Sequence, residues 1–234
     1  MTETAPTLQP LYLFADSQLL FWRRNGRLVL DAALNGFARN TAIRAAYVGA
    51  SNGDRMDFYE VFEAAMDAIG IADRRMIVSS FGPADRAFLE CAQLIVLAGG
   101  DVQRGWATIE ATGMKDVILD RHAKGAVLVG ISAGAVQLGW YGVGETWASA
   151  PAAPFEVFGL VHMVVDTHDE HAGWARLART IHLLDGTVAG LGIPSGGGVI
   201  VHPDATIESL RRPALEFRSE RGRIAHSLLH PKID

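Results

Sequence analysis

Residues 126–139, AVLVGISAGAVQLG, carry the clearest fold signal in the chain. An uninterrupted apolar run leads into Gly130-Ile131-Ser132-Ala133-Gly134, and a segment with helical spacing follows. Continuous apolar runs are typical of strands buried on both faces of a parallel sheet. In a G-x-S-x-G pattern, the glycines allow a tight strand-to-helix turn that presents a nucleophilic serine. The same residues also fit a plain strand–helix junction with Ser132 as the capping residue.

Similar apolar runs occur in the first half of the chain, at 11–14, 43–50, 75–80 and 94–100. The segments that separate or follow these runs have helical spacing, at 56–69, 84–92, 102–112 and 115–124. Strands that alternate with helices indicate an α/β fold with a mostly parallel sheet flanked by helices.

The second half of the chain has a different pattern. Residues 140–158 are rich in Gly, Ala and Pro, which predicts a long loop or short irregular strands, and 170–184 has helical spacing. Short strand-like pieces within 187–219 predict a C-terminal β meander attached to the sheet. Because no repeat or linker divides the chain, we expect one domain over residues 1–234.

Composition excludes several classes of protein. Hydrophobic residues make up 49% of the 234 residues, which is too many for a disordered chain. Lys and Arg number 21 and Asp and Glu 26, so the formal net charge is 21 − 26 = −5. This acidic balance does not favour nucleic acid as a partner. No apolar run approaches the roughly 18 residues of a membrane-spanning helix.

The two remaining compositional signals concern the compartment. The N-terminus lacks the charged-then-apolar order of a signal peptide, and the single cysteine, Cys91, cannot form an internal disulfide. We therefore expect a cytoplasmic protein without a membrane partner. Cys91, in AFLECAQL, lies within an apolar helical stripe, which predicts a buried thiol.

A glycine pair provides the second functional signal, in LIVLAGGDVQRGW (94–106). Gly99, Gly100 and Asp101 come directly after a predicted strand. Backbone N–H groups of Gly100 and Ala133 are the type of donors that form an oxyanion hole beside a serine nucleophile. The alternative is an ordinary strand–helix turn in which Asp101 caps the next helix.

A histidine after a strand provides the third signal, in MVVDTHDEHAGWARL (163–177). Histidine suits the role of a base that accepts a serine proton, and catalytic groups of α/β sheets gather at strand ends. Metal binding by His168, Asp169, Glu170 and His171 is a rival interpretation. The spacing disfavours it, because the two histidines are not placed at i and i+4 on one helical face.

These three motifs together resemble peptidase family S51, which includes dipeptidase E and cyanophycinase. The resemblance covers about residues 43–202 and includes YVGASNGDRMDFYEVFEAAMDAIGI (47–71) and GLVHMVVDTH (159–168). It implies a fold similar to class I glutamine amidotransferases. It also implies Ser132 as nucleophile, His168 as general base, and the N–H groups of Gly100 and Ala133 as oxyanion donors.

The resemblance further implies where substrate is bound. It places Gly99, Asp101, Asp166 and Thr167 beside the substrate. Cyanophycinase-like members carry an acidic pair after a strand that corresponds to Gly190–Ile193, whereas this chain has Pro194 and Ser195 there. Dipeptidase E takes its third catalytic residue from a segment soon after the serine. That comparison favours Glu145, which follows Ser132 by 145 − 132 = 13 residues.

The sequence therefore predicts a serine peptidase that cleaves small peptides through an acyl-enzyme on Ser132. The resemblance implies Asp or a related acidic residue at the cleaved position, and Arg176 is the candidate to bind its carboxylate. No metal or organic cofactor is expected, and a homodimer is expected from the family and the apolar aromatic residues.

Two alternatives remain open at this point. One is an esterase of the α/β-hydrolase fold, with its histidine supplied by His202, His226 or His230. The other is a non-catalytic binding module of the amidotransferase-like fold, which the missing acid after Ile193 favours.

Overall fold

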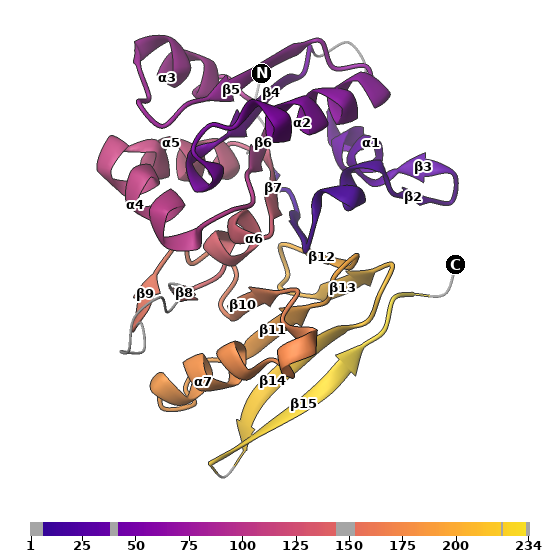
Figure 1. The fold of residues 1–234 in the computed structure, drawn as a ribbon. Coiled ribbons are helices and arrows are strands. Elements are labelled where there is room, and N and C mark those ends of the chain that lie inside the picture. Colours follow the sequence, from indigo (N-terminus) through magenta and orange to yellow (C-terminus); the bar gives the residue numbers. More distant parts are fainter. Residues whose placement is uncertain (1–6, 38–41, 144–152, 221, 233–234) are drawn as a thin grey trace.

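A seven-stranded sheet lies at the centre of the computed structural model, which describes residues 7–37, 42–143, 153–220 and 222–232 (Figure 1). Its strand order is β13-β12-β1-β7-β6-β4-β5. Strands β1, β7, β6, β4 and β5 run parallel to one another. Strands β12 and β13 extend the sheet beyond β1 and pair in antiparallel orientation. The strands are β1 (Leu11–Phe14), β4 (Arg44–Val48), β5 (Asp73–Ile77), β6 (Leu94–Leu97), β7 (Val127–Ile131), β12 (Gly198–Val201) and β13 (Ile207–Leu210).

Helices cover both faces of this central sheet. The helices are α1 (Val29–Ala33), α2 (Met56–Ala68), α3 (Pro83–Leu89), α4 (Val102–Thr112), α5 (Met114–Ala123) and α6 (Ala133–Leu138), with short 3₁₀ turns η1 (Ser17–Phe21), η2 (Leu34–Gly36) and η3 (Ala50–Asn52). A hydrophobic core lies on each face of the central sheet, and alternate residues of β1 belong to one core or the other. Leu13 packs with residues of α3, α4 and α5, and Phe14 packs with residues of η1, α1 and α2. This alternation follows from the period of two along a strand.

A second, four-stranded sheet lies below the central sheet in Figure 1, with α7 (Ala175–Leu183) against one of its faces. Its order is β10 (Val164–Thr167), β11 (Gly190–Ile193), β14 (Ala214–Glu220) and β15 (Arg223–Leu229). Trp174, Leu177 and Phe217 belong to the small core between helix and sheet. The turn η4 (Glu170–Ala172) connects β10 to this helix.

Two short ribbons complete the described elements. They are β2 (Arg23–Arg24) with β3 (Arg27–Leu28), and β8 (Tyr141–Val143) with β9 (Pro154–Glu156). The predicted α/β fold with a mostly parallel, helix-flanked sheet is confirmed. The C-terminal strands are present but divided, because β12 and β13 extend the central sheet whereas β11, β14 and β15 belong to the second.

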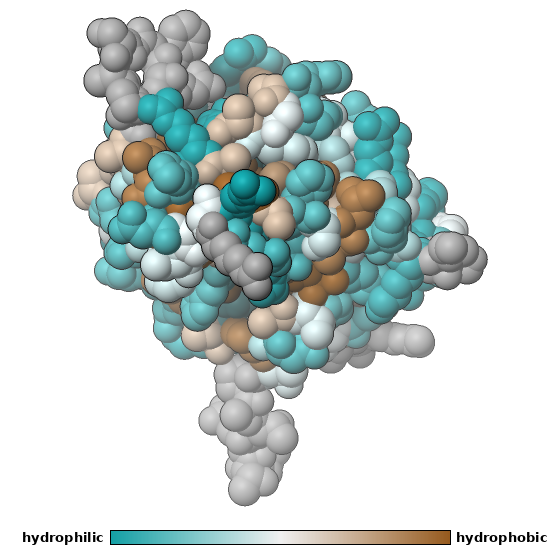
Figure 2. Space-filling view, turned by 90° about the horizontal axis from the view of Figure 1, so that it is seen from below, coloured by the Kyte–Doolittle hydropathy of each residue, from teal (hydrophilic) through white to brown (hydrophobic). Residues whose placement is uncertain are grey.

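Three observations concern the surface and the membrane. Figure 2 shows the molecule from below, and hydrophilic residues cover much of that face, with hydrophobic ones in separate patches. Within the described ranges, no helix has the length and hydropathy needed to cross a bilayer. The prediction that Cys91 is buried is wrong, because α3 ends at Leu89 and the thiol-bearing residue beyond it is exposed.

Candidate active site

Ser132 occupies a tight turn between β7 and α6. Its φ of 50° and ψ of −108° are unfavourable for a residue with a β-carbon. Its N–H donates a hydrogen bond to the carbonyl oxygen of Phe14 at 2.8 Å, which fixes the turn to the end of β1. A β-carbon at Gly130 would lie 2.5 Å from the Gly134 carbonyl, and one at Gly134 would lie 2.3 Å from the Leu97 carbonyl oxygen. The turn therefore requires glycine at both positions of the motif.

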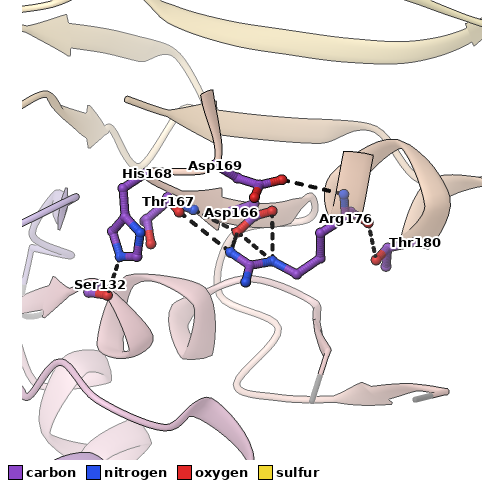
Figure 3. A network of polar contacts seen from close by, with 7 residues as sticks. All are labelled: Ser132, Asp166, Thr167, His168, Asp169, Arg176 and Thr180. Atoms are coloured by element: carbon purple, nitrogen blue, oxygen red, sulfur yellow. Dashed lines mark hydrogen bonds and ion pairs between the residues drawn. The ribbon is translucent and has the colours of Figure 1, made fainter. Parts of the chain in front are cut away.

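His168 comes from the second sheet. It directly follows β10, has a φ of 45°, and donates its N–H to the carbonyl oxygen of Ile193 at 2.9 Å. Its imidazole points toward Ser132, and the Ser132 Oγ to His168 Nε2 distance is 2.8 Å (Figure 3). This distance lies within the range expected for a nucleophile and its general base. Two residues 36 positions apart, from two different sheets, are thus brought into hydrogen-bonding contact.

Asp166 and Arg176 form an ion pair next to this contact. Asp166 is 4% exposed, and its carboxylate accepts hydrogen bonds from the Thr167 N–H at 2.8 Å and from Arg176 Nε at 3.1 Å (Figure 3). Arg176 reaches Asp166 from the first turn of α7, and its own N–H points to the Asp169 carboxylate. Burial raises the pKa of Asp166, and the hydrogen bonds from Arg176 oppose that shift.

A small cavity of about 50 Å³ lies beside Ser132, on the side of the Asp166–Arg176 pair. Its lining includes the predicted residues Gly100, Ser132, Ala133, Asp166, Thr167, His168 and Arg176, together with Tyr141, Leu177 and Thr180. Arg176 retains 39% side-chain exposure there. Residues separated in the sequence therefore meet in one concave site.

The loop after β6 forms another side of the site. Gly100 has a φ of 135°, and a β-carbon there would lie 2.2 Å from the Ser51 carbonyl oxygen. Ala133 is the first residue of α6, so its N–H has no acceptor within its own helix. Asp101 caps α4 through a hydrogen bond from the Arg104 N–H to Oδ1 at 2.8 Å, which is the structural alternative considered from its sequence. Its role in substrate binding stays a prediction.

Comparison with protein families identifies the chain. The family model for peptidase family S51 matches residues 23–208. The chain belongs to peptidase family S51. No curated protein matches it, but solved structures share its fold. A peptidase from an acI-B1 Actinobacterium is similar over 95% of this chain and 96% of its own, with a TM-score of 0.66 and 15% identity. A peptidase E protein from Listeria monocytogenes EGD-e is similar over 88% and 99%, with a TM-score of 0.62 and 16% identity.

Membership of peptidase family S51 makes the chain a peptidase. Glu145 lies outside the described residues, so its role as the third catalytic residue stays a prediction. Within the described ranges, no carboxylate is hydrogen-bonded to Nδ1 of His168. The nearest acids in sequence have other partners, since Asp169 accepts from the Arg176 N–H and Glu170 accepts from the Ser195 N–H at 3.0 Å.

Sequence reasoning did not predict that two carboxylates hold the loop between β11 and β12. Glu170 binds this loop through Ser195, and Asp16 Oδ2 accepts from the Gly196 N–H at 2.6 Å. The loop joins the sheet of His168 to the sheet of Ser132, so both contacts fix the two parts of the S51 site relative to each other. The position of Asp16 soon after a parallel strand was the available signal, because functional groups gather at such strand ends.

The alternative histidines lie elsewhere. His202 Nε2 is 3.4 Å from the Glu208 carboxylate at the β12–β13 edge, and the His226 ring lies 5.5 Å from that of Phe217 on the second sheet. No group of three or more His, Cys, Asp or Glu side chains suited to a metal occurs in the part of the chain that the structure describes.

Proposed function

We propose that this S51 peptidase is a serine peptidase that cleaves small peptides at aspartate or related acidic residues. The observation that carries the proposal is the 2.8 Å contact between Ser132 Oγ and His168 Nε2, with Ser132 held on a strained turn. Backbone strain of this kind is typical of functional sites, because it holds one side chain in a fixed position. The strained turn therefore supports a catalytic role for the Ser132 side chain.

The mechanism follows from that contact. His168 Nε2 takes the Ser132 hydroxyl proton as Oγ attacks the scissile carbonyl carbon. The N–H groups of Gly100 and Ala133 donate to the oxyanion of the tetrahedral intermediate. Collapse of the intermediate breaks the C–N bond, and His168 gives its proton to the departing amine. Water then repeats the sequence on the ester and releases the acid product.

The preference for an acidic residue rests on Arg176. Its guanidinium lines the cavity beside Ser132 and presents a planar set of donors suited to a carboxylate. Asp166 already shares this charge, and that sharing lowers the attraction for a substrate carboxylate. We therefore expect Arg176 to select aspartate mainly by the geometry of its hydrogen bonds to the substrate carboxylate, and less by its positive charge.

A dipeptide screen tests the proposal. The substrates are α-Asp, β-Asp, Glu and neutral N-terminal dipeptides, offered to the wild type and to Ser132→Ala. Ser227→Ala is the matched control, because Ser227 is an exposed serine on β15. We expect the acidic dipeptides to be cleaved by the wild type and the control only. Activity of Ser132→Ala equal to that of the wild type would contradict the serine mechanism, and cleavage of neutral dipeptides alone would contradict the acidic preference.

A further inference from the structure

A second cavity meets the candidate site from the opposite side. Its volume is about 240 Å³, and it lies between the segment after β1 and helix α2. Ser132, His168 and Gly100 line this cavity and also the smaller cavity on the Arg176 side. The hydroxyl nucleophile therefore lies where two cavities join, as expected for a site that receives the side chains on both sides of one peptide bond.

Most residues that line the second cavity are apolar. Leu20, Tyr47 and Phe62 are at least 97% buried and belong to the core on this face of the central sheet. The Tyr47 and Phe62 rings pack with their centroids 5.2 Å apart. Phe58 and Val61 of α2 continue the wall, and Phe58 is 42% exposed. A large aromatic side chain left open to solvent beside a nucleophile offers apolar area that a ligand can cover.

Two polar groups of this cavity, the Tyr47 hydroxyl and the Asp16 carboxylate, already have partners. The Tyr47 hydroxyl accepts a hydrogen bond from Asn52 Nδ2 at 2.8 Å, and burial raises the pKa of Tyr47 to about 12, so the hydroxyl stays neutral. Asp16 accepts from the N–H groups of Gln18 and Gly196. An apolar side chain would enter without breaking these bonds, whereas an acidic one would meet the negative charge of Asp16.

We propose that this cavity binds an apolar or aromatic side chain of the substrate residue whose amine leaves. The inference rests on the proposed function, in which the Arg176 side holds the acidic residue that acylates Ser132. The residue on the other side of the bond then occupies the second cavity. His168 lines that cavity too, so it is placed to protonate the amine that departs into it. The preferred substrate is an acidic residue followed by a large apolar one.

Turnover of four dipeptides tests the proposal: Asp-Phe, Asp-Leu, Asp-Gly and Asp-Glu. We expect kcat/KM for Asp-Phe and Asp-Leu to exceed that for Asp-Gly by at least about tenfold, the usual effect of filling a hydrophobic pocket. Asp-Glu should be the poorest substrate. Phe58→Ala should reduce the ratio of kcat/KM for Asp-Phe to kcat/KM for Asp-Gly by about tenfold.

Met56→Ala is the matched control. Met56 is a large apolar residue of the same helix, is 55% exposed, and does not line the cavity. This variant should retain the selectivity of the wild type. Equal turnover of Asp-Phe and Asp-Gly by the wild type, or an equal loss for both in Phe58→Ala, would overturn the proposal.

A binding measurement separates this proposal from the proposed function. Calorimetric titration of Ser132→Ala with L-phenylalaninamide and glycinamide examines the cavity without any turnover. We expect phenylalaninamide to bind at least about tenfold more tightly, and the difference to disappear in the Ser132→Ala/Phe58→Ala double variant. If no dipeptide is cleaved, the proposed function fails, and this difference still supports an apolar cavity. Equal binding of the two amides would overturn the apolar cavity whatever the activity screen shows.

Discussion

The two sheets hold their catalytic candidates in different ways. Ser132 follows β7, which lies between β1 and β6 in the middle of the seven-stranded sheet, and close packing leaves no room for a β-carbon at Gly130 or Gly134. His168 follows β10, an edge strand of the smaller sheet, and is itself exposed. Packing therefore fixes the serine, whereas a few hydrogen bonds fix the histidine. Adding atoms to the packed glycines around Ser132 should therefore alter folding, whereas removing the Ser132 hydroxyl, or changing the residues that hold His168, should alter catalysis with little effect on folding.

The largest effect expected is that of Ser132→Ala. Loss of the nucleophile should lower kcat by a factor on the order of 10⁶, the precedent from a model serine protease. The thermal unfolding midpoint should change little, because His168 is the one hydrogen-bond partner of the Ser132 hydroxyl among the described residues and the backbone bond to Phe14 remains. Steady-state kinetics and thermal melts of the variant and of Ser227→Ala measure both quantities. A variant that unfolds would contradict the separation of packing from chemistry at this residue.

His168→Ala should approach the same loss in kcat, because the base and the nucleophile act as one unit. Steady-state kinetics of folded His168→Ala measure this loss. A His168→Ala variant with substantial residual turnover would remove His168 from the role of base.

The packing side of the comparison is tested by Gly130→Ala. The added β-carbon would lie 2.5 Å from the Gly134 carbonyl, and overpacking of this kind typically costs about 1–3 kcal/mol or more in free energy of unfolding. Gly82→Ala is the control, since a β-carbon there has no neighbour within 4 Å. Urea unfolding of both variants gives the two free energies. Equal stability of the two variants would show that the turn tolerates a β-carbon.

The hydrogen-bonded side is tested by Glu170→Ala. Removing this carboxylate releases the Ser195 N–H and loosens the loop that connects the sheets of His168 and Ser132. A displacement of about 1 Å at a reacting group can cost on the order of 10²-fold in rate, so we expect kcat to fall by about 10- to 100-fold. The pH profile should keep its shape, because the base itself is unchanged. Glu216→Ala, at a glutamate on β14 that pairs with Arg218, should leave kcat as in the wild type.

The smallest effect expected concerns the Asp166–Arg176 pair. Burial raises the pKa of Asp166 above the unfolded value of about 3.9, so the folded state binds the carboxyl proton of Asp166 more tightly than the unfolded state does. Protonation of Asp166 therefore stabilises the folded state. This contribution is complete below the unfolded pKa and is lost as the pH rises through the folded pKa. The unfolding free energy of the wild type minus that of Asp166→Asn should therefore fall as the pH rises from about 3 to about 6.

An exposed aspartate gives the opposite control. Hydrogen bonds from Thr206 lower the pKa of Asp204, so the same difference for Asp204→Asn should rise over that pH range. Denaturant unfolding at several pH values measures both slopes. A rising difference for Asp166→Asn would mean that Arg176 outweighs burial.

Local signals in the sequence predicted most of the central sheet and its helices. Apolar runs that end in glycine mark β6 and β7, and the same motifs, with their resemblance to a family, pointed to Ser132 and His168. The division of the C-terminal strands between two sheets could not be predicted, because strand period says which residues share a face but not which distant strand becomes the partner. The apolar cavity could not be predicted either. Its lining residues, such as Asp16, Tyr47 and Phe58, lie far apart in the sequence, and each has the local pattern of an ordinary core or surface residue.

The central claim is that Ser132 is a nucleophile activated by His168, and labelling with a fluorophosphonate probe tests it most directly. Mass spectrometry after digestion locates the adduct without any knowledge of the substrate. We predict one stoichiometric adduct on the peptide that contains Ser132, its absence in Ser132→Ala, and strongly slowed labelling in folded His168→Ala. No adduct on the wild type, or an adduct that forms equally fast without His168, would contradict the claim.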